Sequence, residues 1–284
     1  MRIADETLEL LRRALGDHAA PRVRALHLPP APWDGGKAGE FCAIELDDGS
    51  LGLSFVLLGD TLAELAAGTH GEALVGAEAL AVAHLWSHGR GAKRTLGFAA
   101  VNALTRHLFD RASFVPPAAS DSIGGLDPQP GEHIGMVGFF PPLAKAVTAS
   151  GARLTVLELR PDLAGKRDDF HITLAAHELA SCAKVLSTST VLLNDTLGDV
   201  LSHCTAARTF AMIGPGASCL PDVLFHRGVT LLGGVWIEDA DAFKQALAGG
   251  EPWSRHARKF ALLRSHYPGI EALLAKADRS TTTR

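Results

Sequence analysis

The sequence lacks the features that would place it in several common classes of protein. It has no uninterrupted apolar run of membrane-spanning length, and its first residues carry acids in a helical pattern, unlike a secretion leader. A net charge of −4 gives no reason to expect the basic surface that nucleic-acid binding requires. We therefore expect a cytoplasmic protein with no nucleic-acid or membrane partner, for which a homodimer is the default assembly.

Familiar catalytic and cofactor motifs are missing as well. The chain contains no GxGxxG dinucleotide loop, Walker loop, GxSxG elbow or zinc-protease motif. Its four cysteines, Cys42, Cys182, Cys204 and Cys219, are far apart and have no CxxC spacing, so we expect reduced, mostly buried thiols. The basic stretch Arg255–Arg264 is typical of a solvated helix face.

At 284 residues the chain fits two domains, and its patterning divides accordingly. Apolar spacing and turn residues in the first part predict helices at 4–15, 73–87 and 93–110 and strands at 23–28, 41–47 and 51–58. An Asp48-Gly49 turn joins the last two strands into a hairpin. Residues 1–112 are therefore predicted to form an α+β domain.

Residues 113–132 are rich in proline and glycine, which predicts an irregular linker. After it, short apolar runs such as HIGMVGF, RLTVLEL and ARTFAMIG alternate with helical segments. Strands of this kind are buried on both faces, and their alternation with helices indicates a parallel, doubly wound sheet. We therefore predict a Rossmann-like α/β domain over 133–284, with ligands bound at the carboxyl ends of its strands.

The first two strand ends of this domain offer an incomplete nucleotide site. Phe139 and Phe140 lie where a pyrophosphate loop would need glycine, and Pro141 or Pro142 begins the next helix, so ordinary NAD binding is not expected. The loop either lines a ligand or is simply a packed turn, although the helix start could attract an anion. Glu158 ends the second strand, where an acid can accept ribose hydroxyls or remain a surface ion pair.

Later strand ends carry more polar side chains. Thr190, Asn194, Asp195 and Thr196 follow one strand, and their hydroxyl and amide groups either cap helices or bind a ligand. The turn Gly214–Ser218, containing Pro215 and Gly216, follows the next strand. Its backbone N–H groups could cradle an anion, with Ser218 and Asp222 adding side chains, or the turn could be a rigid connector.

Three further residues come from the predicted N-terminal domain. Asn102 interrupts an otherwise favourable helix, which suits either a buried structural amide or a contact to a ligand in the cleft. His84 and His88 are four residues apart on a predicted helix and could share a metal ion, although the sequence specifies no third ligand.

Several of these motifs resemble a known family. VGFFPPL, the run Thr190–Thr196 and GPGASCLPDVLFHRGV are similar to the putative heavy-metal chelation family DUF364, and the upstream hairpin and AAVNAL helix look like the DUF4213 domain that precedes it. The resemblance implies an enolase N-terminal-like α+β domain, a Rossmann-like domain and a site between them. It carries over as motif positions Asn102, Phe139, Pro141, Asn194, Thr196, Gly214, Pro215, Pro221 and Phe225. The chain departs from the family at Asp195, where glycine is usual, and at Gly216, where serine is frequent.

The leading hypothesis is a protein that binds a small polar or anionic metabolite, or a metal chelate, in the cleft between the domains. The candidate ligand-binding residues are Asn102, Phe139, Pro141, Glu158, Thr190, Asn194, Asp195, Thr196, Gly214, Pro215, Gly216, Ser218 and Asp222. One alternative is an enzyme that uses Glu158, Asp195 or Asp222 in the same cleft as acid or base. Another is a direct metal binder with histidine and cysteine ligands.

Overall fold

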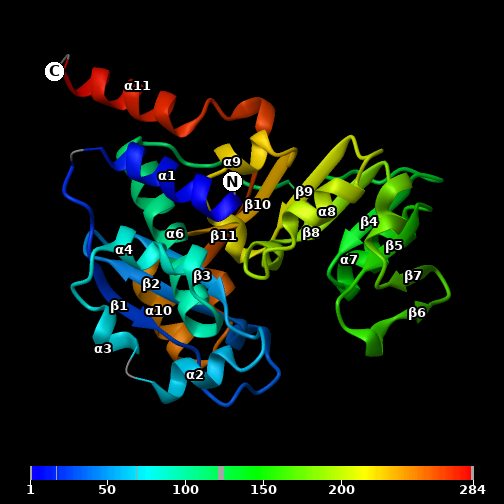
Figure 1. The fold of residues 1–284 in the computed structure, drawn as a ribbon, viewed down its shortest axis with the longest axis horizontal. Helices are drawn as coiled ribbons and strands as arrows, with labels where there is room; N and C mark the ends of the chain where they lie inside the picture. The colour runs from blue at the N-terminus through cyan, green and yellow to red at the C-terminus, as the bar shows by residue number, and fades with distance from the viewer. Residues whose placement is uncertain (1, 17, 69, 121–124, 283–284) are drawn as a thin grey trace.

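The computed structural model describes residues 2–16, 18–68, 70–120 and 125–282, which form two units that lie side by side (Figure 1). The N-terminal unit contains α1 Ile3–Leu15, β1 Val23–His27, β2 Phe41–Leu46, β3 Leu51–Phe55, α2 Thr61–Ala67, α3 His70–Leu74, α4 Ala79–Ala83, α5 Leu85–His88 and α6 Gly91–Arg111. The C-terminal unit contains β4 His133–Val137, α7 Pro141–Ala149, β5 Arg153–Leu157, β6 Gly165–Lys166, β7 Phe170–Thr173, β8 Lys184–Thr188, α8 Leu197–His203, β9 Thr209–Ile213, α9 Asp222–His226, β10 Leu231–Ile237, α10 Ala240–Gly249, β11 Ala257–Leu263 and α11 Ile270–Thr282.

The N-terminal unit is the predicted α+β arrangement. Strands β1, β2 and β3 form an antiparallel sheet, and α6 packs across it. Gly52 makes this packing possible, because a Cβ atom there would lie 2.0 Å from the backbone nitrogen of Ala103 on α6. The further likeness to enolase N-terminal domains stays a prediction.

The C-terminal unit confirms the predicted doubly wound sheet. Its strand order is β11-β10-β9-β8-β4-β5-β7-β6, in which the strands from β10 to β7 are parallel and the two edge strands are antiparallel. The order reverses between β4 and β8, which is where the loops of such a sheet separate and ligands usually bind. Strands β10 and β11 lie against the N-terminal unit, whereas β4 to β7 extend away from it (Figure 1).

Two local predictions are wrong. The segment 73–87 is not one helix: α3 ends at Leu74, and Gly76 adopts a positive φ of 80° before α4 begins. The basic stretch Arg255–Arg264 is not a helix face, because most of it is strand β11, paired with β10 along its whole length. Phe260 and Leu262 are buried at a spacing of two, so the strand period is present among the basic residues.

The predicted linker runs beside the outer edge of β11. Ala118 forms an isolated antiparallel bridge with Phe260, and the carbonyl of Pro117 accepts a hydrogen bond from the backbone of Ala261. Arg258 donates through Nη2 to the carbonyl of Pro116 at 2.8 Å. The connection therefore covers part of a sheet edge that would otherwise expose unpaired backbone groups.

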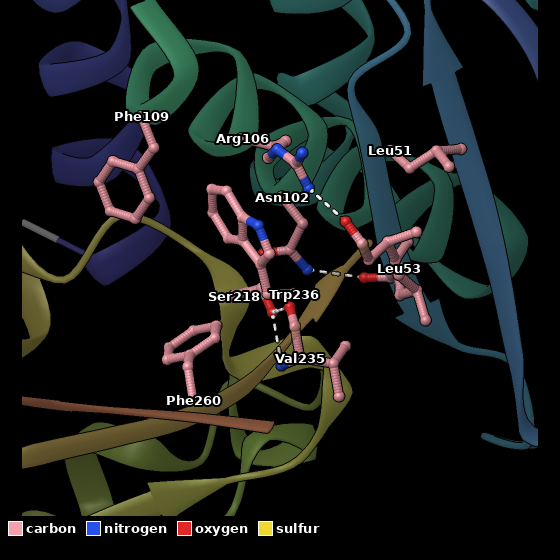
Figure 2. Close-up of a pocket in the computed structure, with 10 residues that line it drawn as sticks. Leu51, Leu53, Asn102, Arg106, Phe109, Ser218, Val235, Trp236 and Phe260 are labelled. Carbon is pink, nitrogen blue, oxygen red and sulfur yellow. Dashed lines mark hydrogen bonds between the residues drawn. The ribbon is translucent and has the colours of Figure 1, made fainter. Parts of the chain in front are cut away.

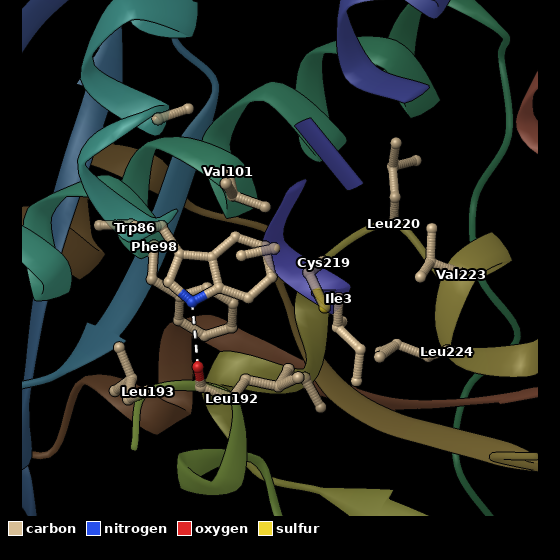
Figure 3. Packing of buried hydrophobic residues seen from close by; sticks show 14 of the residues in the cluster. Ile3, Trp86, Phe98, Val101, Leu192, Leu193, Cys219, Leu220, Val223 and Leu224 are labelled. Carbon is tan, nitrogen blue, oxygen red and sulfur yellow. Dashed lines mark hydrogen bonds between the residues drawn. The ribbon is translucent and has the colours of Figure 1, made fainter. Parts of the chain in front are cut away.

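The two units share one hydrophobic core. Trp86 and Phe98 of the N-terminal unit pack in the same cluster as Leu192, Cys219 and Leu220 of the C-terminal unit (Figure 3). A shared core of this kind makes the units a rigid pair, because separating them would expose buried apolar surface to water. Within the described residues, no helix is both long enough and apolar enough to cross a membrane.

A buried carboxylate adds a charged contact between the units. Glu45 on β2 is 5% exposed and lies 2.8 Å from Nε2 of His27, 3.3 Å from Nη1 of Arg24 and 3.2 Å from Nζ of Lys244 on α10. Burial opposes ionisation of Glu45, but the hydrogen bonds from His27 and Lys244 outweigh it and lower the pKa of this carboxyl group. Glu45 therefore links the N-terminal sheet to the C-terminal unit as a carboxylate.

The close approach at Gly52 predicts a large effect of a single methyl group. Gly52→Ala places Cβ against backbone atoms of α6 that cannot move aside, so it should reduce the free energy of unfolding by more than about 3 kcal/mol. Urea unfolding followed by circular dichroism measures this change. The control is Gly198→Ala in α8, where the new Cβ meets nothing within 4 Å and should raise stability by about 0.5–1 kcal/mol.

The Glu45 cluster predicts a pH dependence of stability. At pH 7, Glu45→Gln should destabilise the protein by about 1–3 kcal/mol, because Arg24, His27 and Lys244 lose the carboxylate that they share but keep partial access to water. The pKa of Glu45 is lowered on folding, so the contribution exists above the ordinary value of about 4.3 and is lost as the pH falls through the folded value. The gap between wild type and variant should thus close in acid, and a gap that persists at pH 3 would contradict this role. Glu9→Gln, in an exposed pair with Arg12, is the control and should change little.

Candidate functional site

One face of α6 brings the predicted site residues of the two units into contact. Arg94, Phe98, Asn102 and Arg106 are spaced four residues apart, which places them on one stripe of the helix. Their partners follow the carboxyl ends of β8, β9 and β10 in turn: the carbonyl of Leu192, the Gly216 turn and the carbonyl of Ile237. We call these four residues the α6 stripe. Arg94 and Asn102 are two turns apart, about 12 Å along the axis, so they mark two separate places.

Asn102 lies in the buried part of the junction, which we call the seam. Its side chain is 1% exposed, and Nδ2 donates to the carbonyl of Leu53 at 2.6 Å and to that of Gly216 at 3.4 Å. Figure 2 shows the amide between β3 and the side chain of Trp236. The NH₂ end of the Asn102 side chain therefore has a structural role, because it joins a strand of one unit to a turn of the other.

The turn after β9 is closed by backbone hydrogen bonds at Gly214. Gly214 has a φ of 127°, its N–H donates to the carbonyl of Gly233, and its carbonyl accepts from Ala217. Gly216 is buried and closely surrounded. A Cβ atom there would lie 3.0 Å from Oγ of Ser189 and 3.3 Å from the ring of Phe98. The part of the turn that faces Asn102 is thus a carbonyl oxygen, which suits a donor and repels an anion.

Ser218 anchors the same turn to β10. Its hydroxyl lies 3.1 Å from the carbonyl oxygens of Pro215 and Val235, and it accepts from the backbone N–H of Val235. Gly234 permits this contact, because a Cβ there would lie 2.7 Å from Oγ of Ser218. Pro215 and Ser218 therefore serve the rigid connection between strand and helix.

The other end of the α6 stripe is accessible and charged. Arg94 is 18% exposed; its Nη2 lies 3.4 Å from the carbonyl oxygen of Leu192 and 3.8 Å from Oδ1 of Asp195, and its buried Nε has no hydrogen-bond partner. Burial lowers the pKa of Arg94, and the charge of Asp195 opposes this shift. We call Arg94 and the facing loop Thr190–Thr196 the rim.

The rim loop is held by its own polar side chains. Oδ1 of Asn194 accepts from the hydroxyl of Thr196 at 2.6 Å and from its backbone N–H at 3.2 Å. Thr190 bonds through Oγ1 to the hydroxyl of Thr188 at 2.9 Å. Asp195 has a φ of 61°, a left-handed conformation in which glycine is least strained, and its side chain is 47% exposed. The residue at which the chain departs from the family resemblance therefore has a backbone conformation that glycine adopts without strain.

The loops that follow β4 and β5 are hydrogen-bonded to each other. Glu158 accepts hydrogen bonds from the backbone N–H groups of Phe139 at 2.9 Å, Leu159 at 2.7 Å and Arg160 at 3.4 Å. The ring of Phe139 packs on that of Phe170, with centroids 5.6 Å apart. The carboxylate of Glu158 therefore accepts hydrogen bonds from the backbone N–H groups that would otherwise be free to bind a phosphate.

The start of α7 is a poor anion site, contrary to the expectation from its sequence. Its first two residues, Pro141 and Pro142, have no backbone N–H, and the N–H of Leu143 donates to the carbonyl of Phe140. An anion would also meet the carboxylate of Glu158, which binds the N–H of Phe139 next to this helix start. The first four residues of α7 therefore offer a pyrophosphate no free backbone donor, because the N–H of Ala144 also donates to the carbonyl of Phe140.

Asp222 lies apart from the seam and the rim. Its Oδ2 accepts from the hydroxyl of Tyr267 at 2.8 Å, and its Oδ1 accepts from the backbone N–H of Ile270 at 3.0 Å, at the start of α11. Burial, together with the charge of Asp222, raises the pKa of Tyr267. Asp222 also lines a different groove, between α1, α9 and α11. It therefore fixes the C-terminal helix and does not complete the predicted cleft.

The histidines and cysteines do not assemble into a metal centre. His84 and His88 are exposed and stack with ring centroids 6.5 Å apart. Across the described part of the chain, no three His, Cys, Asp or Glu side chains are grouped closely enough to hold a metal ion. Burial raises the pKa of the four thiols, to about 11 for Cys182 and about 12 for the other three, so the thiolate that binds heavy metals is disfavoured.

Sequence reasoning singled out Asn102 but missed Arg94 and Arg106. Arg106 packs over the ring of Trp236 with its guanidinium carbon 3.9 Å from the ring centroid and donates to the carbonyl of Ile237 at 3.0 Å. Both arginines lie at multiples of four from Asn102, so the helical period could have indicated them once Asn102 was taken as an inward-facing residue.

Comparison with known proteins gives the same two parts. The DUF364 profile, described as "Putative heavy-metal chelation", matches residues 122–264, and the DUF4213 profile, with the same description, matches residues 39–105. An uncharacterized protein of Methanocaldococcus jannaschii is 30% identical over 153 residues, which cover 52% of this chain and 56% of that protein. The match thus spans only about half the length of that relative.

Two crystal structures of DUF364 proteins of unknown function have a similar fold. The protein from Pyrococcus horikoshii has a TM-score of 0.67 and 18% identity, with 92% of this chain and 99% of that chain covered. The protein from Desulfitobacterium hafniense has a TM-score of 0.68 and 20% identity, with 92% and 100% covered. At these identities the likeness establishes the fold alone.

The backbone at Asp195 predicts a stabilising substitution. Asp195→Gly should raise the free energy of unfolding by up to about 1 kcal/mol, because glycine adopts the positive φ without strain and the long contact to Arg94 contributes little. Asp199→Gly, within α8, is the matched control and should cost about 0.5–1 kcal/mol. Chemical denaturation compares the two, and a loss of stability in Asp195→Gly would show that its carboxylate holds the rim together.

Proposed function

We propose that this protein, which belongs to the DUF364 family, binds a small anionic molecule at the rim, between Arg94 and the Thr190–Thr196 loop. Arg94 carries the proposal. Its Nε has no partner, and the neighbouring Nη2 makes only contacts of 3.4 Å and 3.8 Å, longer than charge-assisted hydrogen bonds usually are. These two nitrogens form one edge of the guanidinium group, which matches a pair of oxygens in a carboxylate or phosphate.

The facing loop provides polar groups that suit such a ligand. Oδ1 of Asn194 is engaged by Thr196, which leaves the Nδ2 end of the amide as the donor end. Thr190 contributes a hydroxyl group, and Asp195 is exposed enough to turn toward solvent when an anion takes its place beside Arg94. The proposal therefore uses the predicted residues of the β8 strand end and adds Arg94 from the N-terminal unit.

The heavy-metal description of the family fits this chain only in an indirect way. Soft metal ions prefer thiolates, and the described thiols are buried with raised pKa values. Besides the carboxylate of Asp195, the rim offers guanidinium, amide and hydroxyl groups, a set that is poorly suited to a soft metal ion. A metal would therefore reach this protein as cargo already held by an organic acid, and the acid would be the part that Arg94 recognises.

Titration calorimetry with inorganic phosphate and with citrate tests the rim on the purified full chain. Arg94→Gln should weaken binding of whichever probe the wild type takes by about 10- to 100-fold, because a charge-assisted pair is replaced by a neutral amide. The matched control is Arg111→Gln on the same helix. Arg111 also has a buried Nε without a partner, but its two terminal nitrogens donate to the carbonyls of Leu15 and Ala14.

Native mass spectrometry of freshly purified protein provides a second readout that does not depend on the choice of probe. A small molecule retained by the wild type and by Arg111→Gln, but lost from folded Arg94→Gln, supports the proposal. Equal retention or equal affinity in all three proteins would refute the rim as the site.

A further inference from the structure

The seam contains a small, partly open cavity between the two units. It lies between α6 and the inner face of β10 and β11, and its volume is about 20 Å³. Asn102 and Arg106 line it from the helix, and Ser218, Trp236 and Phe260 line it from the other unit (Figure 2). This cavity is separate from the rim, which lies about two turns away along α6.

The orientation of the Asn102 amide follows from its neighbours. Its nitrogen faces two carbonyl oxygens, those of Leu53 and Gly216, so the reverse orientation would place oxygen against oxygen. Oδ1 is therefore the other end of the amide, and it is buried without a hydrogen-bond partner. A buried amide oxygen without a partner loses its bonds to water and gains nothing in return, which makes it an exception that requires an explanation.

The size of the cavity limits what can satisfy this oxygen. On this measure one water needs about 10–15 Å³, so the space suits one water, and a second would fit only at the lower limit. A metabolite of several heavy atoms would not fit. The guanidinium of Arg106 on the lining disfavours a cation, and the Oδ1 acceptor disfavours an anion.

We infer that the seam contains one ordered water molecule, which donates a hydrogen bond to Oδ1 of Asn102. Protein atoms satisfy the donor end of the amide, and solvent satisfies the acceptor end. Asn102 is then a fixed joint between the units and not a contact to a ligand in an opening cleft. This inference does not depend on the rim, because either site can exist without the other.

A crystal structure of the full chain at about 1.5 Å resolution tests the inference. We expect one water 2.7–3.2 Å from Oδ1 of Asn102, about the range of ordinary hydrogen bonds. Its counterpart in solution is a water cross-peak to the Asn102 side-chain amide protons in nuclear magnetic resonance spectra. Empty density, a direct protein donor to Oδ1 such as the indole of Trp236, or density for a larger ligand would each overturn the inference.

Matched variants at one lining residue provide the control. Val235→Ile adds a methyl group at a residue that lines the cavity and should displace the water, lowering the unfolding midpoint by about 2–10 °C because Oδ1 is left without a partner. Val235→Thr keeps the volume and should retain the water. Retention of the water in crystals of Val235→Ile, or its loss from Val235→Thr, would contradict the assignment. Arg94→Gln should leave the water in place, so failure of the rim proposal and failure of this inference are distinguishable.

Discussion

Helix α6 joins the N-terminal unit to the C-terminal unit through the α6 stripe, which packs against the strand ends of the doubly wound sheet. The positions of the seam and the rim depend on this packing. Phe98 lies against Gly216, and Gly52 lets β3 approach the helix backbone at Ala99, Asn102 and Ala103. The helix is therefore held between a strand of its own unit and a turn of the other. The Gly52 contact is closer than a methyl group would allow, and a Cβ at Gly216 would crowd Phe98 and Ser189, so the relative position of the two units has little freedom.

This packing separates two chemical environments along one helix. At Asn102 the junction is buried around a small cavity, and the amide nitrogen donates to backbone carbonyls of both units. At Arg94 the same junction reaches solvent, and a guanidinium group faces a loop of hydroxyl and amide groups with only long contacts. The predicted cleft is thus better described as a buried seam and a partly exposed rim. Of the two, the rim has a charged group, Arg94, that makes only long contacts to its neighbours.

Much of the architecture could be predicted from the sequence, because the patterns that indicate strands, helices and turns depend on residues that are close together in the chain. The apolar runs from HIGMVGF onward indicated a parallel sheet, and the Asp48-Gly49 turn indicated the hairpin. Strand β11 escaped notice because its basic residues suggested a solvated helix, while the alternation of Phe260 and Leu262 was the stronger signal. The residues of β11 fitted both a helix face and a strand, and only the pairing with β10 distinguishes the two.

The candidate site was harder to predict, because the use of a polar group depends on which group lies opposite. Glu158 appeared available for a ligand, yet backbone N–H groups of its own and the preceding loop occupy it. Asp222 is close in sequence to Ser218, but its carboxylate turns to Tyr267 and the start of α11. Arg94 carries no motif, and its role follows only from the loop that the second unit places beside it.

Native-state hydrogen–deuterium exchange tests the central claim, which is that the α6 stripe joins the two units into one rigid body. Amides of α6 between Arg94 and Arg106 should exchange as slowly as those of β9 and β10 and through the same global unfolding. Exchange of the α6 amides through a separate, faster opening, with the sheet still protected, would show that the junction is a mobile cleft and would contradict the account.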